Sequence, residues 1–197
     1  MAWVYSLSSE CGPDKTRAEA FARHFEGLSF GLATGKTSAC SAVVHSDEET
    51  NWWVHVCPNN VTRSGGSSLT DAIEISEIGF RLYKHLKSAP PFRFALFGCE
   101  VEEFRLYSEL ADDVAIYRDG RTEFNNSPAF NGLVLSRDAW ETLGKPIAFF
   151  PFAGNYRWRP YGGKEHSVIL DDEEYGRLLR GLQDELYPKD VAPGDNT

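Results

Sequence analysis

Two β-prone runs, Ala39-Cys40-Ser41-Ala42-Val43-Val44-His45 and Trp52-Trp53-Val54-His55-Val56-Cys57, are joined by the polar segment Ser46-Asp47-Glu48-Glu49-Thr50. The second run is rich in β-branched and aromatic residues, which pack well on a pleated sheet. A short polar connection between two such runs is typical of a β-hairpin. Pro58 stops the second run because proline cannot donate to a strand ladder. The segment therefore predicts an antiparallel sheet.

The rest of the chain alternates helix and strand patterns around this hairpin. Helices are expected from Asp14 to about Gly27, from Ser68 or Thr70 to about Lys87, after Ser136, and from Asp171 to Pro188, with a weaker helical pattern in Glu100–Leu110. Strands are expected at 3–7, 92–97, 114–117 and 132–135, with a second hairpin over 147–152 and 156–159. The pattern predicts a single α+β domain over 1–190, a mostly antiparallel sheet with hairpins packed by about four helices, and a flexible tail at 191–197.

Composition narrows the class of protein. The chain has 197 residues, of which 42% are hydrophobic and 25% charged, an ordinary globular balance. The first residues carry neither a basic segment nor a long apolar run, and nothing resembles a membrane span, so a cytoplasmic protein is expected. The four cysteines, at positions 11, 40, 57 and 99, form no CxxC pair. No cofactor motif is found, and the protein is not expected to be an enzyme.

The charge balance argues for a basic protein partner. The formal net charge is −9, with 9 basic and 11 acidic side chains in residues 1–100 and 11 and 18 in residues 101–197. Direct nucleic-acid binding is disfavoured because it needs clustered Lys and Arg. Complementary charge instead raises the association rate with a basic protein. The acidic residues expected to contact it are Asp47, Glu48, Glu49, Glu100, Glu102, Glu103, Asp112 and Asp113.

Three patterns offer alternative readings. Gly31–Thr37 approaches a phosphate-binding P-loop, but its glycines are one residue too close and a strand pattern follows, so it is interpreted as a polar turn. A cleft near Arg63–Ser68, before a helix N-terminus, would suit a small enzyme or ligand-binding domain. A metal site at Cys40, His55 and Cys57 is conceivable if the two cysteines face each other across the hairpin.

Aromatic residues supply the candidate anchors of a protein contact. The segment Phe149–Tyr161 is unusually aromatic, and most of its rings are expected in the core. Tyr156 and Trp158 alternate with arginines, as in a strand with one buried face. Because Tyr, Trp and Arg are enriched at interface hot spots, Trp52, Tyr156 and Trp158 are predicted as anchors, provided that they are exposed.

The chain resembles the bacterial immunity proteins of polymorphic toxin systems, in particular the mixed α/β Immunity protein 52 family. The resemblance rests on the Trp52-Trp53 strand, on the step from Gly132-Leu133-Val134-Leu135-Ser136 to Trp140, and on Gly154-Asn155 before Trp158. It implies a non-enzymatic inhibitor that binds a cognate toxin of the nuclease class. The partner's identity, the mode of inhibition and the oligomeric state stay open.

Overall fold

The computed structural model describes residues 5–59, 68–101, 106–110, 131–146, 149–163 and 173–186, and its centre is an eight-stranded antiparallel sheet. The strands are β1 (Tyr5–Glu10), β2 (Ser29–Gly31), β3 (Thr37–Ser46), β4 (Trp52–Pro58), β5 (Phe94–Cys99), β6 (Val134–Ser136), β7 (Phe150–Pro151) and β8 (Tyr156–Trp158), in the order β2-β3-β4-β1-β5-β6-β8-β7. The helices whose bounds lie within the described residues are α1 (Lys15–Phe25), α2 (Leu69–Leu86), α4 (Arg137–Thr142) and α5 (Glu173–Leu186), and residues 107–110 are also helical. The predicted α+β class with an antiparallel sheet is confirmed.

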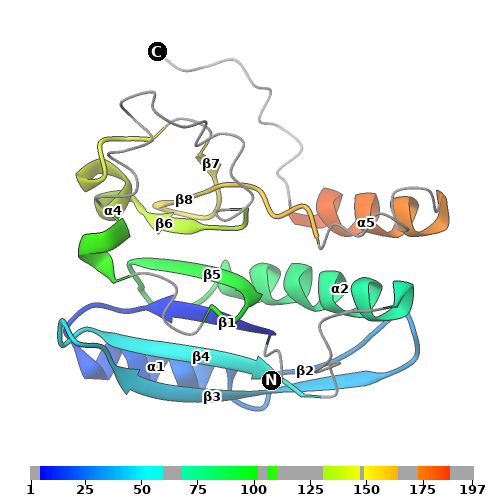
Figure 1. Cartoon of the computed structure of the whole chain (residues 1–197), viewed down its shortest axis with the longest axis horizontal. Helices are drawn as coiled ribbons and strands as arrows, with labels where there is room; N and C mark the ends of the chain where they lie inside the picture. Colours follow the sequence, from blue (N-terminus) through cyan, green and yellow to red (C-terminus); the bar gives the residue numbers. More distant parts are fainter. Residues whose placement is uncertain are drawn as a thin grey trace.

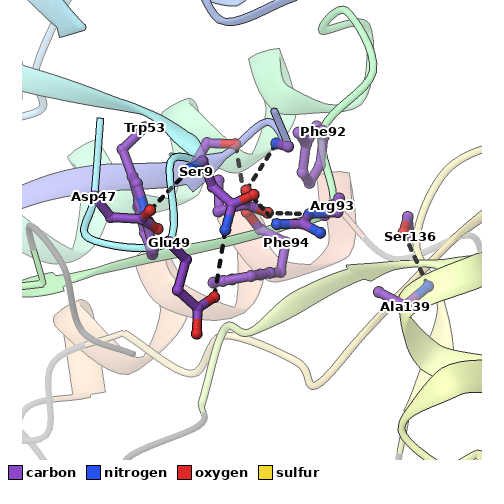
Figure 2. Close-up of polar contacts among 12 residues, drawn as sticks. Ser9, Asp47, Glu49, Trp53, Phe92, Arg93, Phe94, Ser136 and Ala139 are labelled. Carbon is purple, nitrogen blue, oxygen red and sulfur yellow. Dashed lines mark hydrogen bonds and ion pairs between the residues drawn. The ribbon is translucent and has the colours of Figure 1, made fainter. Parts of the chain in front are cut away.

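The helices begin where short polar side chains can cap them. Asp14 accepts a hydrogen bond from Thr16 N at 2.9 Å ahead of α1. Ser68 and Asp71 form a reciprocal capping box at the start of α2, and Ser136 accepts from Ala139 N at 3.2 Å at the start of α4 (Figure 2). Each cap satisfies a backbone N–H that has no partner inside the helix. These three predicted helix starts are confirmed.

The central strand β1 fixes the register of the sheet. Leu7 pairs with Val56 of β4 on one side and with Phe97 of β5 on the other. All six residues of β1 are buried. Because successive strand residues point to opposite faces, burial of every residue means that both faces of β1 are covered.

One face of the sheet packs on α1 and α2. Its core cluster joins Phe21 and Phe25 of α1 and Ile75 and Ile78 of α2 to the β1 residue Leu7. Figure 1 shows α1 along β3 and β4, and α5 beside α2. Many residues of α2 are buried because the helix contacts both β1 and α5.

A second core lies on the opposite face. Trp53 of β4, Phe94 of β5 and Leu135 of β6 are each 0% exposed, and they pack with Leu110 and with Leu143, which follows α4. The six-residue α4 and the segment 106–110 thus contribute to covering this face. Among the described residues, no helix is both long and apolar enough to cross a membrane.

The strand β2 was not predicted. Residues 31–37 were interpreted as a polar turn. A turn is present at 32–36, but Ser29–Gly31 pairs with β3 as a short edge strand. The strand predicted at 114–117 and the tail at 191–197 lie outside the described residues.

Candidate partner-binding surface

The β3–β4 hairpin ends in a three-residue loop, Glu48-Glu49-Thr50. Asp47 N donates to Asn51 O at 2.9 Å, and Thr50 N donates to Asp47 O at 3.1 Å. Thr50 has a φ of 63°, in the left-handed region. A turn followed by one left-handed residue is a standard three-residue hairpin loop. A β-branched residue there costs about 1–2 kcal/mol, so other contacts must hold this loop.

The side chain of Asp47 supplies those contacts. Its Oδ1 accepts from Asn51 N at 2.8 Å, and its Oδ2 accepts from the indole Nε1 of Trp53 at 2.8 Å (Figure 2). Trp53 is fully buried and Asp47 is 9% exposed. Both carboxylate oxygens therefore tie the loop to the core, and Asp47 is a structural residue with little surface to offer a partner.

Glu48 and Glu49 remain exposed on this fixed loop. Glu49 accepts from Asn51 Nδ2 at 3.4 Å and from Ser108 Oγ, which joins the loop to the segment 106–110. Glu109 of that segment is also exposed. Within the described residues, none of these three carboxylates forms an ion pair with a basic side chain. We call Glu48, Glu49 and Glu109 the acidic tip.

An ion pair between the buried Glu10 and the partly exposed Arg93 lies beside the segment that carries Glu109. Glu10 is 0% exposed and accepts from Arg93 Nη2 at 2.7 Å and from Gly12 N at 2.7 Å. Burial raises the pKa of the Glu10 carboxyl, while its hydrogen bond with Arg93 works against that rise. The Arg93 guanidinium lies 4.0 Å from the ring centroid of Tyr107, beside Ser108. The network therefore connects β1, the start of β5 and the segment that carries Glu109.

The three predicted aromatic anchors do not form one open surface with the acidic tip. Trp158 is 1% exposed and belongs to the core, so it fails the condition of exposure. Tyr156 is half-buried, stacks on Phe92 with ring centroids 4.3 Å apart, and its hydroxyl accepts from Phe92 N at 3.0 Å. Trp52 is half-buried beneath the Lys15 ammonium, which lies 5.1 Å from its ring centroid.

The strand order explains this separation. Three strands lie between β4, which carries Trp52, and β8, which carries Tyr156. Four interstrand steps amount to roughly 19 Å. Both residues lie at the same end of the sheet as the acidic tip, because the registers link Trp53 through Glu10, Phe94 and Leu135 to Arg157.

The predicted acidic residues are also divided. Glu100 is exposed but follows Cys99, which pairs with Tyr5 at the opposite end of the sheet from Glu10. It therefore cannot belong to the same patch as Glu48. Glu102, Glu103, Asp112 and Asp113 lie outside the described residues. Sequence reasoning missed Glu109, and neither Ser108 nor Tyr107 carried a signal of the contacts it makes.

The metal reading at Cys40, His55 and Cys57 is not supported by the register. Cys40 pairs with Pro58, and Cys57 pairs with Ser41. Directly paired residues share a face, so the two cysteines point to opposite faces, and the condition on which this metal site depended is not met. Burial raises the pKa of the Cys40 thiol to about 12. In the part of the chain described here, no three His, Cys, Asp or Glu side chains are grouped to hold a metal.

Of the other two alternatives, the structure describes the P-loop-like segment fully and the cleft near Arg63–Ser68 only in part. Lys36 of the P-loop-like segment donates to Glu74 Oε2 at 2.9 Å, and Thr34 Oγ1 donates to Glu74 Oε1 at 2.8 Å. Glu74 is 1% exposed, so the segment is a turn clamped to α2, with its lysine already paired. Of the cleft near Arg63–Ser68, only Ser68 is described, and it caps α2.

These features define an α+β protein with an antiparallel sheet and a rigid acidic hairpin tip. Comparison with protein-family models, with curated proteins and with solved structures gives no match.

Proposed function

We propose that the protein is a non-enzymatic cytoplasmic inhibitor, of the immunity-protein kind, that binds a basic toxin through the acidic tip. The observation that carries the proposal is that Glu48 and Glu49 stand exposed on a loop whose conformation is fixed by the buried Asp47. A contact that is ordered before binding loses less conformational entropy when the complex forms.

Charge supports the same proposal. The tip carboxylates have no basic partner among the described residues, and the chain as a whole has a net charge of −9. Exposed charges of one sign steer an oppositely charged protein into contact and raise the association rate. Enzymes that act on nucleic acids present basic surfaces to phosphates, so a nuclease toxin offers the matching surface. The carboxylates of the acidic tip would then occupy the surface of the toxin that binds the phosphates of its substrate.

The contact has two chemical components. The acidic tip provides charge at the end of the hairpin, and Trp52, half-buried at the start of β4, adds apolar surface once a partner displaces the Lys15 ammonium that lies over its ring. Buried interface aromatics with a charged rim are the usual arrangement of a binding hot spot. Inhibition follows if this end of the sheet blocks the substrate path of the toxin.

The first experiment asks whether a partner exists. The product of the neighbouring upstream gene is co-expressed with this chain, and toxicity, rescue and co-purification are measured. The proposal expects toxicity alone, rescue with this chain and a stable complex. The absence of both toxicity and a complex would contradict the proposal.

The second experiment locates the contact. The triple variant Glu48→Gln, Glu49→Gln, Glu109→Gln is compared with a control of equal charge change at the exposed Glu26, Glu100 and Glu141. The tip variant should lower the association rate about 10-fold at low salt, because charge steering varies the rate by about 10–10³-fold. An equal effect in both variants would show that net charge, and not the tip, governs binding.

A further inference from the structure

A cavity of about 300 Å³ lies between β2 and the second half of α2. Because β2 pairs with the start of β3 and the hairpin loop follows the end of β3, the cavity lies at the opposite end of β3 from the acidic tip. Arg81, Lys84 and His85 line it from α2, and Ser29 and Phe30 line it from β2. Among the described residues that line the cavity, none carries a carboxylate. Its basic lining contrasts with the negative net charge of the chain.

The cavity runs along the edge of the sheet. Consecutive strand residues point to opposite faces, so a cavity that touches both Ser29 and Phe30 must lie at the strand's edge. β2 is the terminal strand of the sheet in the described residues. This edge is therefore bordered by α2 and by no further described strand.

The hydrogen-bond ladder leaves polar backbone groups on that edge. Cys40 N donates to Leu28 O at 2.8 Å, and Leu32 N donates to Lys36 O at 2.8 Å. Ladder bonds alternate along an antiparallel strand, so the even-numbered residues of this segment bond to β3. The N–H and C=O groups of Ser29 and Gly31 consequently point outward, as a template for another strand.

The basic side chains differ in how firmly they are held. Arg81 donates through Nε and Nη2 to Glu77 Oε1, at 2.9 and 2.6 Å, and its guanidinium lies 5.8 Å from the Phe30 ring centroid. Lys84 donates to Glu185 Oε2 at 2.7 Å, but these side chains are 61% and 57% exposed. Exposed ion pairs contribute little, so an incoming carboxylate can replace Glu185.

We propose that this edge binds an extended acidic peptide, which adds to β2 as a ninth strand and places a Glu or Asp side chain against Lys84 and Arg81. Backbone bonds to Ser29 and Gly31 supply affinity, and the cavity supplies specificity for the carboxylate. Glu185 already shows a carboxylate on Lys84. A second copy of the chain is disfavoured, because edge-to-edge pairing of two β2 strands brings both basic sets together.

The test uses an end-blocked peptide of alternating Val and Thr with one central Glu, and a twin with Gln in its place. Amide NMR should show the Glu peptide shifting Ser29 and Gly31, with the Gln twin about five-fold weaker, as loss of one such pair implies. Lys84→Gln should abolish the preference for Glu, and Glu185→Gln should strengthen binding. Lys145→Gln is the matched control, since Lys145 is 60% exposed and also paired to a glutamate.

A separate substitution tests whether the peptide pairs with the backbone of β2. Gly31→Pro removes the outward N–H and should abolish binding, whereas Gly31→Ala keeps it, and a Cβ there meets nothing within 4 Å. Equal affinity for both peptides, shifts confined to other elements, or no binding to the unmodified protein would overturn the proposal. The lysine variants decide the outcome even if the proline variant fails to fold.

Discussion

Replacing Asp47 with asparagine should destabilise the protein far more than its place at a hairpin tip suggests. Asp47 accepts two hydrogen bonds, from Asn51 N and from Trp53 Nε1. Asparagine has one acceptor oxygen, so its amide group must face one of these donors. The abandoned donor costs about 1–3 kcal/mol, and when it is the indole of the fully buried Trp53, water cannot replace the partner. We expect a loss of about 2–3 kcal/mol.

The assay is urea unfolding at neutral pH, followed by far-UV circular dichroism. With a slope of about 2–3 kcal/mol per M for a chain of this size, the midpoint should fall by about 1 M. Glu48→Gln is the control and should change stability by less than about 0.5 kcal/mol, since Glu48 is exposed. A double-mutant cycle that combines Asp47→Asn with Trp53→Phe should give a coupling energy of about 1–2 kcal/mol between the two side chains. If the Asp47→Asn variant unfolds at the same urea concentration as the unmodified protein, the carboxylate does not hold the loop.

Three further predictions concern the core, the pH dependence and the helices. Arg93→Met should cost about 3–5 kcal/mol in urea unfolding because it leaves the buried Glu10 without its partner, and adding Glu10→Gln should recover part of the loss. His24 has a pKa below its ordinary 6.5, mainly through burial, so the unfolded chain binds more protons. The free energy of unfolding should therefore fall as the pH falls below about 6.5, because protonation of His24 favours the unfolded chain. His24→Gln should weaken this pH dependence in unfolding titrations. Gly79→Ala should lower the free energy of unfolding, measured by thermal melting, by about 1–3 kcal/mol, because its Cβ would lie 2.6 Å from an aromatic ring. Gly181→Ala, in open space on α5, should instead raise the free energy of unfolding by up to about 1 kcal/mol. Equal effects of the two substitutions would contradict the packing around Gly79.

Local chemistry made the elements predictable. Ser68 and Ser136 mark helix starts because their hydroxyls replace the missing partners of the first turn, which depends only on neighbours in sequence. The hairpin was predictable for the same reason. β2 was missed because three residues without an alternating apolar pattern become a strand only through β3, beside which they lie.

The candidate surface was predictable only in part, because exposure and register are properties of the fold. Glu48 and Glu49 were identified correctly as exposed carboxylates. Asp47, adjacent to them, is buried because an indole from the second strand needs an acceptor. The two cysteines do not share a face, because a shift of one residue in register exchanges the faces of a strand. No property of either residue by itself reveals that shift.

The count of acidic residues overstates the charge available to a partner. Glu10, Asp47, Glu74 and Glu77 are each 9% exposed or less. Each is bound by hydrogen bonds from the protein. Burying a carboxylate is costly unless it is paired, so these four serve the fold. Charge reversal at the buried positions should therefore unfold the protein, whereas reversal at the acidic tip should leave it folded and change only association. A stable fold with unchanged association after reversal of Glu48, Glu49 and Glu109 would remove the tip from the contact.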